Sequence, residues 1–272
     1  MRVVDFCFPV ASGQRELIIG DRQTGKSSVL LSSALNSASR FAAVVYRKSL
    51  IFGTALIGSR FTLTLRAGIS VISAYGQITS SILASPGTSM VSAVYICPLA
   101  CSSVMEAGRY AGSHSAACYD DLSKHAVSYR QLCLFLKKPA GREAFPSDIF
   151  FVHARILERS CNLACSQSSG SSLCLPVVET LQNDLSAYIA TNVVSITDGQ
   201  LYCDTSLFGA AQCPAVSIER SVSRVGAKSL PPVYRATSFG IYRVLSEYRQ
   251  GRLAYRPSQL AITRCFIQRS AA

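Results

Sequence analysis

The chain has no tryptophan, only three histidines and few charged residues, which make up 15% of its 272 positions. Nearly half of the residues (49%) are hydrophobic, so enough apolar surface is present to build a core. This composition excludes collagen-like, coiled-coil and wholly disordered chains. The length suits one large domain or two small ones.

Acidic residues are scarce: 15 Asp and Glu stand against 27 Lys and Arg, a net charge of +12. Clustered basic residues would favour nucleic acid, because they release counterions from phosphates. Here they are scattered, and we favour a solvated basic surface or an acidic neighbouring subunit over nucleic-acid binding. The densest groups are Lys137-Lys138 and a tail that contains Arg249, Arg252, Arg256, Arg264 and Arg269.

The pattern of the 11 cysteines indicates neither a disulfide framework nor a zinc site. Their odd number, spread along a long chain, does not resemble a disulfide framework. Cys97/Cys101 and Cys161/Cys165 have the spacing CxxxC, but no histidine lies near either pair in the sequence to complete a zinc site. We expect buried free thiols and a reducing compartment.

No secretory signal is legible at the N-terminus, where an apolar h-region is missing. Residues 67–105, 39 positions, carry no charge and are long enough for a membrane span. The stretch is rich in Ser, Thr and Gly, contains Pro86 and Pro98, and has no continuously apolar window of 18 residues. This composition disfavours a transmembrane helix.

A phosphate-binding motif follows the first apolar run. Residues 15–30 read RELIIGDRQTGKSSVL, in which Gly20, Gly25, Lys26 and Ser27 fill the pattern G-x-x-x-x-G-K-[ST]. Glycines let backbone N–H groups turn onto phosphate oxygens, the lysine neutralises the outer phosphates, and the serine hydroxyl can ligate Mg²⁺. The pattern predicts a strand, a nucleotide-binding loop and a helix; the alternative is a structural glycine turn.

Such a loop needs a second strand that ends in a carboxylate near the metal. Residues 115–124, SAACYDDLSK, offer one, although residues 115–118 have less apolar bulk than a central parallel strand usually carries. We assign Asp120 to the magnesium shell. An N-cap of the following helix is the alternative role, and both could hold.

Longer blocks of sequence resemble the alpha subunits of F-type ATP synthases. The blocks are GQRELIIGDRQTGKSS (13–28), YDDLSKHAVSYRQ (119–131), GREAFPSDIFFVHARILER (141–159), LPVVET (175–180), SAYIATNVVSITDGQLY (186–202) and SVSRVG (221–226). The resemblance is weak over 37–118 and 227–249, and we find none after about residue 250.

The resemblance implies an α/β fold: a RecA-like P-loop nucleotide-binding domain with a mostly parallel central sheet flanked by helices. We expect that domain over 1–249, with 37–118 divergent, and a basic tail over 250–272 as the remnant of a C-terminal region. The family's N-terminal barrel is expected to be absent. Pro231-Pro232 cannot lie inside a helix, whereas Ile241 to Tyr248 keeps helical spacing.

Site residues follow from the resemblance, position by position. The family's loop binds ATP or ADP with Mg²⁺, with Asp120 in the metal shell and Glu179 near the same site; a surface ion pair is the alternative for Glu179. The implied nucleotide-binding residues are Gly20, Asp21, Arg22, Gln23, Thr24, Gly25, Lys26, Ser27 and Ser28.

Catalytic beta subunits carry a glutamate after the next strand, where alpha subunits have glutamine. The best match here is Ser59, which is no general base at neutral pH, so the chain's own site is expected to be non-catalytic. Alpha subunits instead supply an arginine in trans. The match is Arg224, supported across the interface by Ser195. An exposed or structurally paired arginine is the alternative for Arg224.

The resemblance thus implies a non-catalytic, Mg-ATP-binding alpha-type subunit of a proton-translocating synthase. Its expected partners are beta subunits in an alternating hexamer, gamma and peripheral-stalk subunits; it would meet the membrane only through the complex. We expect the matrix side of the mitochondrial inner membrane, with a plastid or bacterial membrane as alternatives. Two other functions stay open: an autonomous P-loop ATPase, and a divergent structural or assembly relic.

Overall fold

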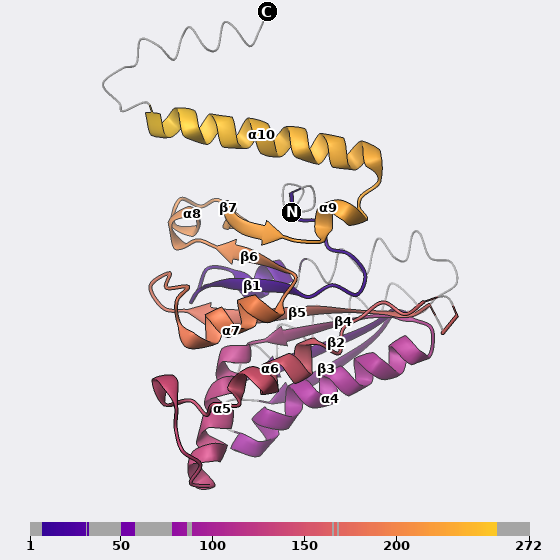
Figure 1. The fold of residues 1–272 in the computed structure, drawn as a ribbon, viewed down its shortest axis with the longest axis vertical. Coiled ribbons are helices and arrows are strands. Elements are labelled where there is room, and N and C mark those ends of the chain that lie inside the picture. The colour runs from indigo at the N-terminus through magenta and orange to yellow at the C-terminus, as the bar shows by residue number, and fades with distance from the viewer. Residues whose placement is uncertain are drawn as a thin grey trace, which may run out of the picture. The chain divides into compact units, whose positions relative to one another are not determined.

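The chain is described by a computed structural model over residues 7–30, 32, 50–57, 78–85, 89–164, 166–167 and 169–254. It divides into two units, residues 1–229 and 230–272. In the first unit, the described strands form one sheet in the order β3-β2-β4-β5-β1-β6-β7 (Figure 1). The strands are β1 (Glu16–Asp21), β2 (Leu50–Ile57), β3 (Ile78–Ser85), β4 (His114–Asp120), β5 (Ser171–Thr180), β6 (Gly199–Cys203) and β7 (Val216–Ser223).

The sheet is mostly parallel, which confirms the predicted fold class. Among the described strands, five pairs run parallel, and only β7 pairs antiparallel to its neighbour, β6. The helices are α4 (Val91–Tyr110), α5 (Leu122–Phe135), η1 (Arg142–Ala144), α6 (Ile149–Leu157), α7 (Tyr188–Ile196), α8 (Thr205–Gly209), α9 (Gly226–Ser229) and α10 (Pro232–Ala254).

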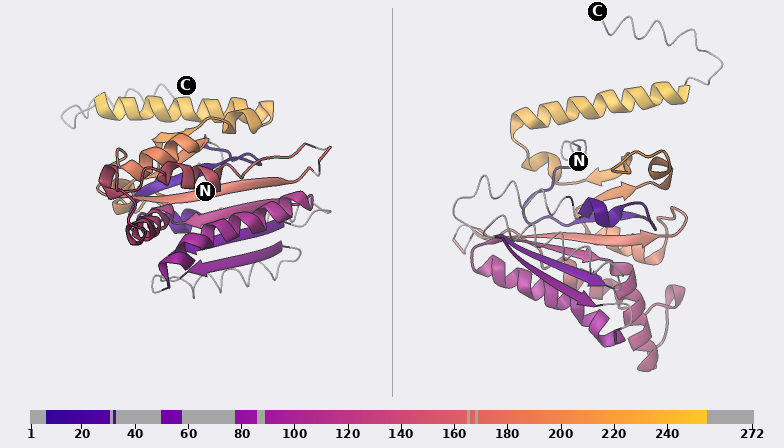
Figure 2. Two further views of the ribbon diagram at one scale, coloured as in Figure 1. Left: turned by 60° about the horizontal axis from the view of Figure 1, so that its bottom comes forward. Right: turned by 180° about the vertical axis from the view of Figure 1, so that it is seen from behind.

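Two apolar clusters cover the two faces of the sheet, because side chains alternate along each strand. Leu17 and Ile19 pack with residues of α4, α6 and α7, whereas Ile18 packs on the other face with Val29 and Leu30. The latter two belong to the helical segment 26–30 that follows the phosphate motif, and that segment, in indigo, is visible from behind (Figure 2, right). The segments before and after the motif, β1 and residues 26–30, are therefore both packed in the core of the sheet.

The small residues of β4 are buried at the centre of the sheet. β4 pairs with β2 and β5, and Ala116, Ala117 and Cys118 are at most 6% exposed. Helix α4 covers this region and places Cys101 and Met105 in the same core cluster as Ala117. The bulk that β4 lacks is thus supplied by the helix packed on it.

Helix α4 contains the C-terminal part, residues 91–105, of the charge-free stretch that attracted a membrane interpretation. Among the described helices it alone is long and apolar enough to span a membrane by length and composition. It nevertheless packs on the sheet, it buries Arg109, and its Glu106 forms an ion pair with Arg159. Layer packing of an α/β fold accounts for the apolar residues on its buried face, such as Cys101 and Met105.

Two further expectations concern cysteines and prolines. Cys97 and Cys101 are buried free thiols, as predicted, whereas Cys165 lies outside the described residues. In the second unit, α10 begins at Pro232, with Pro231 just before it. The first turn of a helix tolerates proline because its N–H groups have no intrahelical acceptor. The proline pair therefore starts the helix that covers Ile241 to Tyr248 and does not interrupt it.

Candidate nucleotide-binding site

The phosphate motif lies at the edge where the parallel strands end. β1 ends at Asp21, β4 at Asp120 and β5 at Thr180, and these neighbouring strands run in the same direction. Gly20 is in register with Glu179. Residues 22–25 form a turn, and helical backbone begins at residue 26, as the sequence predicts. The topology therefore gathers the motif, Asp120 and Glu179 around one edge.

Both motif glycines are required by the backbone, for different reasons. Gly25 has φ +79°, a left-handed conformation that favours glycine. At Gly20, an added Cβ would lie 2.6 Å from the carbonyl oxygen of Cys203 in the adjacent strand β6. Gly20 thus permits close strand packing, and Gly25 permits the turn.

Lys26 is buried, and its ammonium group points back at the loop. Its Nζ donates hydrogen bonds to the carbonyl oxygens of Gly20 (2.9 Å) and Asp21 (2.5 Å). Burial lowers its pKa, while the negative charge of Glu179 acts in the opposite direction. A partly desolvated ammonium group held inside a loop is suited to bind an anion, because few waters compete with that anion.

The two predicted magnesium ligands meet directly. The Ser27 hydroxyl donates a 2.7 Å hydrogen bond to Oδ2 of Asp120, although the residues are 93 positions apart. A hydroxyl and a carboxylate oxygen are the hard ligands that Mg²⁺ prefers, so the residues fit the metal.

The N-cap that the sequence left open for Asp120 belongs to its neighbour. Asp121 precedes α5, and its Oδ1 accepts a 2.7 Å hydrogen bond from the backbone N–H of Lys124. Asp121 is fully buried, and burial raises its pKa to about 6, against the lowering effect of the Lys124 charge. The cap therefore belongs to Asp121, and the magnesium role of Asp120 stays a prediction.

The remaining charged groups of the loop are held by side chains of β5 and by a backbone N–H of the loop after it. Arg22 pairs with Glu179 at 3.2 Å, so the ion-pair alternative for Glu179 is realised in this structure. The Asp21 carboxylate accepts from the Thr180 hydroxyl (2.6 Å) and from the backbone N–H of Asn183 (2.9 Å). Sequence reasoning missed Thr180 and Asn183.

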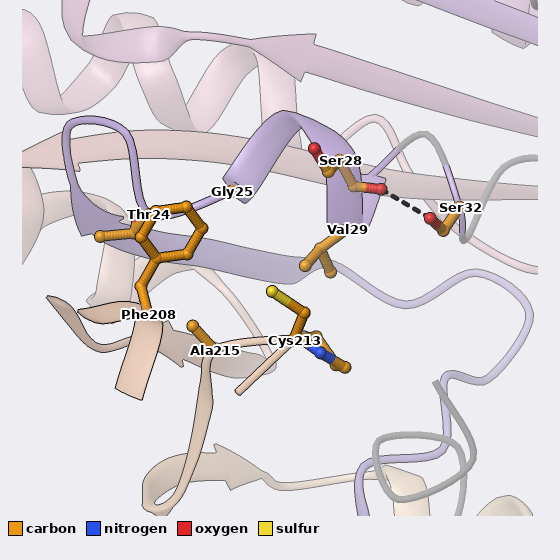
Figure 3. Close-up of a pocket in the computed structure, with 9 residues that line it drawn as sticks. Thr24, Gly25, Ser28, Val29, Ser32, Phe208, Cys213 and Ala215 are labelled. Carbon is orange, nitrogen blue, oxygen red and sulfur yellow. Dashed lines mark hydrogen bonds between the residues drawn. The ribbon is translucent and has the colours of Figure 1, made fainter. Parts of the chain in front are cut away.

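A pocket of about 270 Å³ opens beside the loop (Figure 3). Thr24, Gly25 and Val29 form one side, and the segment from α8 to β7 forms the other. The full lining is Thr24, Gly25, Ser28, Val29, Ser32, Phe208, Cys213, Pro214 and Ala215. Figure 3 shows Phe208, Cys213 and Ala215 directed toward the loop, and Ser32 donating to the carbonyl oxygen of Ser28 at 2.8 Å. No short motif in the sequence marks residues 208–215.

Arg224 lies at the other end of the strands, away from the phosphate motif. Ser223 at the end of β7 is in register with Gly199, the first residue of β6, whereas Cys203 at the other end of β6 is in register with Gly20. Arg224 is exposed, and its backbone N–H donates to the carbonyl oxygen of Asp198 at 3.0 Å. The structure therefore separates Arg224 from the phosphate loop of its own chain.

Residues 1–223 match the sequence model of the ATP synthase alpha/beta family, nucleotide-binding domain. The chain belongs to this family. It is similar to "ATP synthase subunit alpha, mitochondrial" of Trypanosoma brucei brucei, with 41% identity over 250 residues, which cover 92% of this chain and 43% of that protein.

Bacterial alpha subunits are similar to the chain as well. The ATP synthase subunit alpha of Streptococcus mutans is 39% identical over 251 residues, 92% of this chain and 48% of that protein. ATP synthase subunit alpha 1 of Psychromonas ingrahamii is also 39% identical over 251 residues, which cover 92% of this chain and 47% of that protein. The chain is thus an alpha-subunit nucleotide-binding core that spans about half the length of these relatives or less.

The alpha-type prediction also involves two serines, Ser195 and Ser59. Ser195 lies exposed on α7, where its hydroxyl donates to the carbonyl oxygen of Asn192 at 2.7 Å. Ser59 lies outside the described residues, although β2 before it forms as expected and ends at Ile57. The predicted absence of a general base at Ser59 therefore stays a prediction.

Proposed function

We propose that the chain is a non-catalytic, Mg-ATP-binding alpha-type subunit of a proton-translocating F-type ATP synthase, which supplies Arg224 to the catalytic site of a neighbouring beta subunit. The main support is the separation of two charged groups. Lys26 lies in an intact phosphate loop, whereas Arg224 is exposed at the far edge of the same sheet. An arginine at that edge cannot serve its own loop but is accessible to a second subunit.

The proposed binding role uses groups that are already in place. Lys26 and the N–H groups of residues 20–27 would hold the phosphates, Ser27 and Asp120 would hold Mg²⁺, and the pocket beside Gly25 would receive the nucleoside. Bound Mg²⁺ would offset the negative charge of the phosphates. ADP fits the same cradle.

The non-catalytic role is supported by the carboxylates around the loop. In the described part of the chain, Glu179 pairs with Arg22, Asp21 accepts from Thr180, and Asp121 caps α5. A carboxylate that is already engaged is a poor general base for an attacking water. Hydrolysis through many turnovers by the purified chain would contradict this role and favour the autonomous ATPase.

Binding is tested by titrating the purified chain with Mg-ATP in a calorimeter. Lys26→Ala should weaken binding about 10- to 150-fold, the value of one or two charge-assisted hydrogen bonds. Asp120→Asn should remove the advantage of Mg-ATP over metal-free ATP, and Lys138→Ala, which removes an exposed lysine, should change neither. Unchanged binding in Lys26→Ala would favour the relic.

Partnership and the arginine role need the assembled complex. A pull-down of the tagged chain should recover beta, gamma and peripheral-stalk subunits, and recovery of none would favour the relic or the stand-alone ATPase. In a complex with beta subunits, Arg224→Ala should lower turnover about 10³- to 10⁵-fold, because an arginine in trans stabilises charge in the transition state. Fractionation would test the proposed location, the matrix side of the mitochondrial inner membrane, against the plastid and bacterial alternatives.

A further inference from the structure

Gln14 joins three segments at the edge of the sheet where Arg224 lies. Its side chain is 3% exposed and precedes β1. The amide oxygen accepts from the backbone N–H of Ala11 (2.8 Å), while Nε2 donates to Oε2 of Glu16 (2.7 Å) and to the hydroxyl of Ser223 (3.3 Å). Both ends of the buried amide are therefore used, which fixes its orientation.

The Ser223 end of this network controls the backbone around Arg224. The Ser223 hydroxyl accepts from the N–H of Gly226 at 3.1 Å, and the N–H of Arg224 donates to the carbonyl oxygen of Asp198 at 3.0 Å. Gly226 also lies against the N-terminal segment, since an added Cβ would lie 2.4 Å from the carbonyl oxygen of Pro9. The turn is held from several sides, while the Arg224 side chain is exposed.

The Glu16 end gives Gln14 an acceptor in the core. Glu16 is fully buried, and a Cβ on Gly199 would lie 2.4 Å from its Oε2. Burial, and secondarily the charge of Asp198, raise the pKa of Glu16 to about 8. Asp198 is paired with Arg15 at 2.7 Å, whereas the Glu16 carboxyl group accepts the hydrogen bond from Gln14. A protonated Glu16 still offers an acceptor oxygen to the amide.

We propose that Gln14, oriented by Glu16, is a positioning residue for Arg224: through Ser223 it holds the backbone from which the exposed guanidinium reaches a neighbouring catalytic site. The inference rests on the proposed function of Arg224. Gln14 touches no substrate and acts only by fixing the backbone position of Arg224. An arginine supplied in trans is effective because it is in place before the reaction, so a loosened turn should lower turnover without changing nucleotide affinity.

The positional claim is tested first on the full chain, by hydrogen exchange of the peptide around residues 222–227. Gln14→Leu should speed exchange there at least about tenfold, because the Ser223 anchor is lost. Ile156→Val, a truncation in the core near α4, is the matched control and should leave the peptide's exchange unchanged relative to the rest of the chain. Equal exchange in Gln14→Leu and the wild type would overturn the inference.

A swap of the two side chains separates hydrogen bonding from simple packing. Gln14→Glu places a second carboxyl group beside Glu16 and should also speed exchange, since one buried negative charge is left without a partner. The double variant Q14E/E16Q reverses donor and acceptor and should restore slow exchange. Failure of the swap to restore what Gln14→Glu disturbs would contradict the inference, even if Gln14→Leu proved too unstable to study.

Turnover in the complex then distinguishes this inference from the proposed function. Gln14→Leu should lower kcat with KM unchanged and should have no further effect in the Arg224→Ala background, and the swap Q14E/E16Q should restore the kcat that Gln14→Glu alone lowers. A large loss in Arg224→Ala with none in Gln14→Leu overturns the inference alone. Full turnover in Arg224→Ala overturns the proposed function, and hydrogen exchange still decides whether Gln14 positions the turn.

Discussion

Two buried histidines should make the stability of the chain depend on pH. His125 on α5 and His153 on α6 are fully buried, with ring centroids 5.8 Å apart, and Tyr95 stacks on His125 at 5.3 Å. Nε2 of His125 bonds the carbonyl oxygen of Tyr95 at 3.2 Å. Nδ1 of His125 and both ring nitrogens of His153 have no hydrogen-bond partner within the described structure.

Burial lowers both pKa values, to about 4 for His125 and about 3 for His153, where the charge of His125 contributes as well. The unfolded chain, with an ordinary histidine pKa of 6.5, therefore binds more protons than the folded chain at acidic pH. Stability is present above pH 6.5 and is lost as the pH falls toward the folded values. At pH 5 the loss is roughly 2 kcal/mol per histidine.

The assay is urea unfolding at pH 7 and pH 5, followed by circular dichroism. The variant His125→Gln/His153→Gln should lose about 4 kcal/mol less than the wild type between these pH values, because neither glutamine titrates. His114→Gln removes the third histidine, leaves the pair intact and should keep the full loss. The reasoning is refuted if the double variant and the wild type lose the same free energy of unfolding.

Three further predictions concern the sheet and the pocket. Glu16 has a folded pKa of about 8 against an ordinary 4.5, so the stability that this one group contributes should be lost as the pH rises through this range, by roughly 3 kcal/mol at pH 7, opposite in direction to the effect of the histidines. Glu16→Gln should flatten that dependence in urea unfolding, and an unchanged slope would contradict it. Gly20→Ala should lower the unfolding free energy by about 1 to 3 kcal/mol and weaken nucleotide binding, because its Cβ would meet Cys203; Gly209→Ala, with nothing within 4 Å, should be tolerated in the same thermal and binding assays. Saturating Mg-ATP should slow maleimide labelling of the exposed Cys213, followed by peptide mass spectrometry, and equal rates with and without nucleotide would show that the nucleoside does not occupy the pocket.

The conformation of the phosphate loop could be predicted from local sequence. Its conformation depends on glycines at fixed spacing between an apolar strand and a helix, and each of these features is a property of consecutive residues. The structure accordingly has the turn at 22–25 and helical backbone from residue 26. The aspartate pair was harder, because the sequence left open whether Asp120 also caps the following helix and gave no role to Asp121. Backbone direction at the end of β4 gives the cap to Asp121 and frees Asp120 for Ser27.

The pocket and the Gln14 network escaped sequence reasoning for another reason. Phe208 and Cys213 face Gly25 only because β6 lies beside β1 in the sheet, and nothing near residues 208–213 indicates a ligand. Gln14 and Ser223 are 209 positions apart and meet because β7 returns antiparallel along β6. Strand order is set by the packing of the whole sheet, so contacts that depend on it carry no local signature.

The sequence by itself determined the phosphate loop, the mostly parallel α/β class and the membership in the ATP synthase alpha/beta family, since each rests on residue types at fixed spacing. Scarce charge and a long uncharged stretch left the role of residues 67–105 ambiguous, and packing decided it for α4, which covers the small residues of β4. The tertiary structure also decided where Arg224 lies. Its distance along the chain from Lys26 carries no spatial meaning, whereas the antiparallel turn of β7 places it at the edge opposite the phosphate loop.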